Sequence, residues 1–184
     1  MDVITALVSH HSVLRQLHQQ AETDPGAAEE FIRHLIIHHT MEEKYFYNLL
    51  EKFGEARHDA LEAVNEHHII EMIIKDVERF PRDHEQFAIK IEGLGEYTTH
   101  HLDEEEAEIF PLAAQLFDAG HLATLGRLFE DAKGKLLGVS LPEVPAAITA
   151  TIGSPGHGEK KRDVPEEGPP AGTAVGLGIG SLKA

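Results

Sequence analysis

The spacing of apolar positions predicts four long amphipathic helices and one shorter helix. Apolar residues recur every three or four positions through residues 2–20, 25–53, 55–79 and 83–117. This is the period of a helix that buries one face. A shorter segment with the same period follows at residues 121–136. The short loops favour an all-α fold, an up-down-up-down four-helix bundle with a short fifth helix packed on it.

Residues at the ends of these segments indicate where the helices begin, end or bend. Asp2 is expected to cap the first helix, and Asp24 to cap the second with Pro25 in the first helical position. Pro111 is expected to bend the fourth helix. The pair at residues 119–120 is expected to separate the fourth helix from the fifth.

The chain changes character after Gly138. Residues 138–174 are rich in proline, glycine, alanine, serine and charged residues, and they show no sustained period. Such composition is typical of a disordered segment. We therefore divide the chain into a bundle at residues 1–137, a flexible linker at 138–174 and a distinct C-terminal peptide at 175–184.

Histidine and glutamate interrupt the apolar stripes near their centres. Each long helix carries one histidine on its stripe, and two helices add a glutamate four residues later, on the same face. Cores rarely bury four imidazoles and two carboxylates that have only one another as partners. Two divalent metal ions would use all six as ligands. We therefore favour a metal site over a metal-free structural core, formed by His11, His38, Glu42, His67, His101 and Glu105.

The remaining histidines are harder to place. Each long helix carries a His-His pair, and neighbouring residues lie about 100° apart, so only one of each pair can be central. The other member of each pair can be a partner of a ligand, an extra ligand or a surface residue, and for His10, His39 and His100 we favour the surface. We expect His68 or His34 to contribute more to the site.

The ligand types limit the metal without choosing it. Imidazole and carboxylate without thiolate suit iron, manganese or zinc. A ferritin-like core would need Glu-x-x-His on two helices. That spacing occurs only once here, at Glu55 and His58, and we discount this arrangement.

Composition excludes several classes of function. The chain has 184 residues, a formal net charge of −16 and no cysteine. This acidity disfavours nucleic acid and anionic membrane surfaces as partners. The lack of cysteine excludes disulfides and a cysteine nucleophile. No signal peptide and no membrane-spanning run of about 18 apolar residues is evident, so we expect a cytoplasmic protein.

Four segments together resemble the hemerythrin-like, HHE cation-binding domain family: residues 10–17, 38–47, 66–68 and 101–111. The family's ligand positions fall on the six residues above. The resemblance implies two iron ions in an oxo- or hydroxo-bridged, non-haem centre. It implies that the histidines are terminal ligands and that Glu42 and Glu105 bridge the metals. Such a centre binds O2 or reacts with small oxidants.

One position departs from the O2-carrying hemerythrins. They have a fifth histidine one turn after the third-helix ligand, where this chain has Glu71. His68, His34 or a glutamate such as Glu71 is expected to fill this role, unless the site is more open. The departure leaves room for peroxide or nitric oxide turnover. No residue is an evident catalytic acid, base or nucleophile, so reactivity would lie at the metals. The alternative is a non-catalytic O2- or iron-binding carrier, store or sensor.

The C-terminal peptide resembles the cargo-loading peptide of encapsulin systems. The resemblance implies a cargo protein bound to an encapsulin shell inside a bacterial nanocompartment, protecting against oxidative or nitrosative stress. Glycine allows close backbone approach to a partner surface, and the apolar residues can fill small pockets. A linker of about 35 residues has a coil reach of roughly 30 Å. Whether the bundle forms a homodimer is left open. The matching residues are Leu177, Gly178, Ile179, Gly180, Ser181, Leu182 and Lys183.

Overall fold

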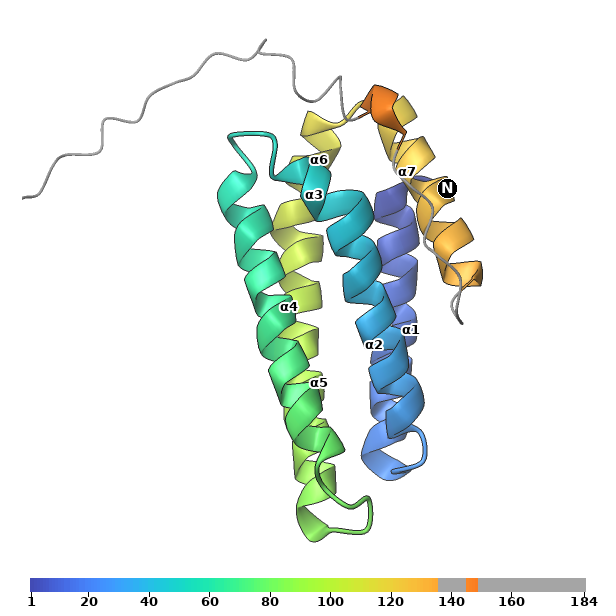
Figure 1. Ribbon diagram of the computed structural model, residues 1–184, viewed down its shortest axis with the longest axis vertical. Helices are drawn as coiled ribbons and strands as arrows, with labels where there is room; N and C mark the ends of the chain where they lie inside the picture. The colour runs from blue at the N-terminus through green and yellow to red at the C-terminus, as the bar shows by residue number, and fades with distance from the viewer. Residues whose placement is uncertain (136–144, 149–184) are drawn as a thin grey trace, which may run out of the picture. The chain divides into compact units, whose positions relative to one another are not determined.

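The computed structural model describes residues 1–135 and 145–148, and all regular secondary structure within them is helical (Figure 1). The predicted all-α class is therefore confirmed. The chain divides into two units, Met1–Ser154 and Pro155–Ala184. The C-terminal peptide and most of the predicted linker lie outside the described residues. The helical elements are α1 (Val3–Thr23), α2 (Ala28–Glu42), η1 (Glu43–Tyr47), α3 (Asn48–Leu50), α4 (Arg57–Glu78), α5 (Glu85–Glu104), η2 (Glu105–Ile109), α6 (Phe110–Leu116) and α7 (Ala119–Gly134).

Helices α1, α2, α4 and α5 form the four-helix bundle (Figure 1). Successive long helices run in opposite directions, as the short loops predicted. Helix α7 packs beside α1 and is the predicted fifth helix. Among the described residues, no helix is both long and apolar enough to cross a membrane.

Side-chain caps begin three of the helices. Asp2 accepts a hydrogen bond from the Thr5 N–H at 3.0 Å, as expected for the cap of α1. His84 accepts one from the Gln86 N–H at the start of α5. Asp118 accepts one from the His121 N–H and so begins α7 at residue 119. The expectation that residues 119–120 lie between helices is therefore wrong.

The start of α2 also differs from the sequence prediction. Asp24 accepts a hydrogen bond from the Gly26 N–H, and α2 begins only at Ala28. Pro25 therefore lies in a turn and not in the first helical position. The side chain of Asp24 stabilises this turn instead of the end of the helix.

Two π-helical segments interrupt what the sequence predicted as continuous helices. The segment η1 follows Glu42 directly, and η2 begins at Glu105. A π-helical turn holds an additional residue and changes the direction of the side chains that follow it. Pro111 lies in the first turn of α6, directly after η2, where proline is tolerated. The departure from a regular α-helix, which was expected at Pro111, lies just before it at residues 105–109.

The apolar core consists of two clusters, and the buried histidines lie between them. One cluster includes Leu7 and Phe46, and the other includes Leu14 and Leu35. Along α1, α2 and α4, the buried histidines lie between residues of the two clusters. In α5, His101 lies between Leu94 of the second cluster and Ile109 of the first, which belongs to η2. Within residues 145–148, positions 146–148 form a helical turn, although the linker was expected to lack regular structure, and Ile148 is buried in the first cluster.

Candidate metal centre

The fold brings the six predicted residues together in the core of the bundle. Each is at most 1% exposed. They form two groups of four whose ligand atoms lie within 4.8 Å of one another. Each group could hold a metal ion, and both include Glu42 and Glu105. The two groups are His11, His38, Glu42 and Glu105, and Glu42, His67, His101 and Glu105.

Glu105 lies between a histidine of each group. Its Oε2 is 3.3 Å from Nε2 of His11, and its Oε1 is 3.3 Å from Nε2 of His101. Oε1 also accepts a hydrogen bond from the Tyr47 hydroxyl, which orients the carboxylate. Each carboxylate oxygen is thus directed to a different group.

Glu42 lies in the same way between the other two histidines. Its Oε2 is 3.3 Å from Nε2 of His38 and 3.5 Å from Nε2 of His67. Its Oε1 is 3.8 Å from Nε2 of His11. The Nε2 atoms of all four histidines therefore point at the two shared carboxylates.

The opposite ring nitrogen, Nδ1, of each histidine has a partner outside these groups. Three of the partners are carboxylates, an arrangement that orients metal-binding histidines and increases their basicity. The Nδ1 contacts are His11 to Glu106 at 2.8 Å, His67 to Glu43 at 3.0 Å, His101 to Glu66 at 2.7 Å and His38 to Nδ1 of His10 at 3.1 Å.

The sequence reasoning missed these outer partners. His10 was expected at the surface, but it is fully buried and also contacts His34 at 3.3 Å. Each outer partner adjoins one of the six residues in the sequence, and neighbours on a helix lie about 100° apart. A polar residue next to a predicted ligand could therefore have identified these partners from the sequence, because its side chain faces the adjacent helix.

The donor atoms that face inward fit a metal ion. Both carboxylate oxygens of Glu42, Oε2 of Glu105 and Nε2 of His11 and His38 are buried without a hydrogen-bond partner among the described residues. Buried polar atoms without partners are costly. Divalent cations that take nitrogen and oxygen ligands would bind all of these atoms.

The buried histidines and glutamates of the site shift one another's pKa values. Burial by itself would lower the pKa of His11, but the hydrogen bonds and charges of Glu105 and Glu42 raise it to about 10. Glu42 and Glu43 likewise overcome the effect of burial on His67 and raise its pKa to about 9. Burial would raise the pKa of Glu105, but the charges of His101 and His11 and the hydrogen bond of His11 lower it to about 2.

His38 and His39 respond in the opposite direction. Burial and the nearby charges of His11 and His10 hold the pKa of His38 well below its usual value. Burial and the charge of His67 do the same for His39. Neutral imidazole is the form that binds metal, so these two rings are ready to act as ligands.

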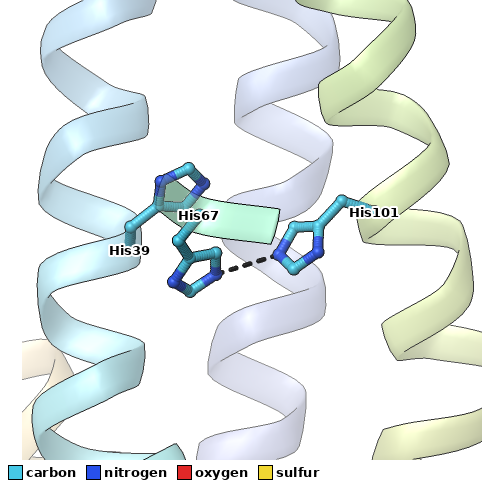
Figure 2. A group of neighbouring side chains, drawn as sticks. All are labelled: His39, His67 and His101. Carbon is cyan, nitrogen blue, oxygen red and sulfur yellow. Dashed lines mark hydrogen bonds between the residues drawn. The ribbon is translucent and has the colours of Figure 1, made fainter. Parts of the chain in front are cut away.

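The additional candidates occupy different places. His68 is exposed, and no group of potential metal ligands among the described residues includes it. Glu71 is half-buried and lies 3.7 Å from Lys75. His34 contacts His10 and, at 3.1 Å, Glu30. Because His10 in turn contacts His38, His34 is linked to the predicted ligands through His10. His39, which was expected at the surface, is buried beside His67 and His101 (Figure 2).

The fold and these groups define a cation-binding four-helix bundle. The sequence profile of the hemerythrin HHE cation-binding domain matches residues 2–113, which contain all six predicted ligands. The chain belongs to this family. No curated protein and no solved structure matches the chain.

Proposed function

We propose that the bundle holds two iron ions that share Glu42 and Glu105 and that it binds O2 or related small oxidants. The observation that carries the proposal is the pair of overlapping donor groups. His11 and His38 would hold one ion, and His67 and His101 the other. Both glutamates would contact both ions, because each directs its carboxylate to histidines of both groups.

The surroundings support chemistry with small, uncharged molecules. When bound, two iron ions supply redox chemistry towards O2, peroxide or nitric oxide. The apolar clusters on both sides exclude bulk water from the site. Phe110 stacks on the His11 ring at a centroid distance of 5.5 Å, and Tyr47 orients Glu105 by its hydrogen bond. These contacts hold His11 and Glu105 in place.

Metal content and an optical spectrum test the proposal. We expect protein produced with added iron to hold two iron ions per chain and to absorb in the near ultraviolet in air, with loss of that absorption on reduction. Glu42→Gln is expected to lower iron affinity at least about 100-fold, because it removes a ligand shared by both ions. Glu62→Gln, which changes a largely exposed glutamate of α4, is the control and should keep the iron. One zinc ion, or no metal with the helices intact, would refute the proposal.

Consumption of peroxide or nitric oxide by the iron form would distinguish an enzyme from a carrier. We propose that the iron form consumes peroxide or nitric oxide, which would protect the cell from oxidative or nitrosative stress. Consumption by the purified iron protein that is lost in Glu42→Gln would support this. Reversible O2 binding without consumption would instead identify a carrier, store or sensor.

We further propose that the protein is a cargo of an encapsulin shell. The support is the segment Leu177–Lys183, which resembles a cargo-loading peptide and places three apolar residues among glycines at the end of a polar stretch. The acidic net charge is compatible with a protein partner and unfavourable for nucleic acid. The proposal implies that the bundle acts inside a bacterial protein compartment.

A further inference from the structure

His39 is the buried histidine of α2 whose ring nitrogens both lack a hydrogen-bond partner among the described residues. It is 1% exposed. Leaving a buried nitrogen unpaired is costly, and here neither nitrogen has compensation. The other buried histidines nearby, His10, His38, His67 and His101, each have at least one ring nitrogen in a hydrogen bond. His39 therefore needs a separate explanation.

The position of the His39 ring beside two other histidines provides this explanation. The His39 ring stacks on that of His67 with centroids 3.9 Å apart and an angle of 8° between planes. It lies edge-on to His101 at a centroid distance of 5.9 Å. Figure 2 shows His39 reaching from α2 towards these two histidines. One nitrogen from each of the three lies within 4.8 Å of the others.

Small shifts of these rings would bring all three nitrogens to a single ion. With metal–nitrogen bonds of roughly 2.1 Å, two ligands on opposite sides of an ion lie about 4 Å apart, and adjacent ligands lie closer. His67 and His101 already belong to the second donor group with Glu42 and Glu105. His39 is thus next to that group, and no hydrogen bond to a described residue holds either of its ring nitrogens.

We propose that His39 is a metal ligand and completes the coordination of the ion held by His67 and His101. The inference rests on the proposed two-metal function. It makes the two positions unequal, with two histidines at one and three at the other. The third histidine would come from α2, beside His38, while the α4 position one turn after His67 holds Glu71, which is half-buried beside Lys75.

The variant His39→Phe tests this assignment. Phenylalanine keeps a stacked ring against His67 and removes both nitrogens. The variant should hold one iron ion as tightly as the wild type and bind the second at least about tenfold more weakly in competition with a chelator. Its Mössbauer spectrum should lose or shift one of two components. His68→Phe, which changes an exposed histidine of α4, is the control and should match the wild type.

Thermal unfolding separates folding from metal binding. Metal-free His39→Phe should melt at or above the wild-type temperature, because it no longer buries two unpaired nitrogens. The temperature increase produced by iron should be smaller in the variant. Wild-type iron stoichiometry, affinity and spectrum in His39→Phe would refute the assignment while leaving the two-iron proposal intact.

If the variant does not fold, a measurement on the wild-type protein tests the assignment of His39 instead. In the reduced iron protein, histidine ligands give ring N–H proton resonances that are shifted by the paramagnetic metals. Five such resonances are expected if His39 binds, and four would refute the assignment. A wild-type protein without iron would instead overturn the proposed function, and this inference with it.

Discussion

The four histidines of the predicted ligand set use their two ring nitrogens differently. Nε2 points at the shared carboxylates, and Nδ1 contacts an outer partner. The outer partner keeps the ring from rotating and determines which nitrogen is free to bind. For His11 this arrangement extends further, because Arg15 donates hydrogen bonds to both Glu106 and Asp103. The ligands are thus oriented before any metal binds.

Glu66→Gln tests the importance of an outer partner. The Glu66 carboxylate lies 2.7 Å from Nδ1 of His101, and a neutral amide would make this contact weaker. We expect iron affinity to fall about 10- to 100-fold, measured by competition with a chelator. Glu62→Gln, one turn earlier on α4 and largely exposed, is the control. Equal affinity in the two variants would contradict the role of Glu66.

The raised pKa values of His11 and His67 predict how the stability of the metal-free protein depends on pH. Both values, about 10 and about 9, lie above the ordinary 6.5, so the protonated rings stabilise the fold below pH 6.5. This contribution is lost as pH rises through 9 and 10. The free energy of unfolding, measured in urea, should therefore fall between pH 6.5 and 10.

The same protons compete with metal. Binding requires His11 and His67 to lose their protons, so iron affinity should rise over that pH range. The metal-loaded protein should lack the decline in stability, because the metal replaces the protons. A metal-free protein whose unfolding free energy is constant from pH 6.5 to 10 would contradict these assignments.

At the scale of helices, the π-helical segments lie at the two glutamates that the donor groups share. Glu42 precedes η1, and Glu105 begins η2. Each segment changes the helical phase just after its glutamate, and Phe46 and Phe110 are buried on the next turn. Such π segments occur often at functional sites. In this bundle both π segments adjoin a glutamate of the candidate metal centre.

Helix α7 approaches the start of α1 closely at Gly126. A Cβ atom there would lie 2.5 Å from the carbonyl oxygen of Met1 and 2.6 Å from the carbonyl carbon of Asp2. These are backbone atoms, which cannot move aside as a flexible side chain can. We expect Gly126→Ala to lower the free energy of unfolding by about 1–3 kcal/mol in urea titrations.

Gly93→Ala is the matched control within α5. Apart from the adjoining backbone of α5, no atom of a described residue lies within 4 Å of its added Cβ. The substitution should therefore stabilise the protein by about 0.5–1 kcal/mol through helix propensity alone. If both substitutions stabilised the protein, the close contact between α7 and α1 would be contradicted.

At the scale of the whole molecule, the proposal separates metal chemistry from location. The bundle holds every predicted ligand within residues 2–113, whereas the proposed cargo peptide begins at residue 175. Deletion of residues 175–184 should therefore abolish co-purification with a co-produced encapsulin shell and leave iron content unchanged. Shell assemblies are isolated by size, and their cargo and iron are measured.

A scrambled Leu177–Lys183 segment is the control for chain length. It should behave like the deletion, because the proposed recognition depends on the spacing of the apolar residues and not on bulk. Equal loading of the intact and scrambled chains would refute the cargo proposal without affecting the metal site.

Helical periodicity determined much of this protein. Because side chains three and four residues apart share a face, the sequence alone predicted the bundle and the burial of the six core histidines and glutamates. Their role as metal ligands stays a prediction. The tertiary structure alone decided the positions of His10 and His39, the carboxylates that contact Nδ1 and the π-helical segments. Periodicity identifies the face of one helix, whereas these features depend on how neighbouring helices are rotated against it. A residue beside the central stripe is exposed on an isolated helix and buried where two helices meet.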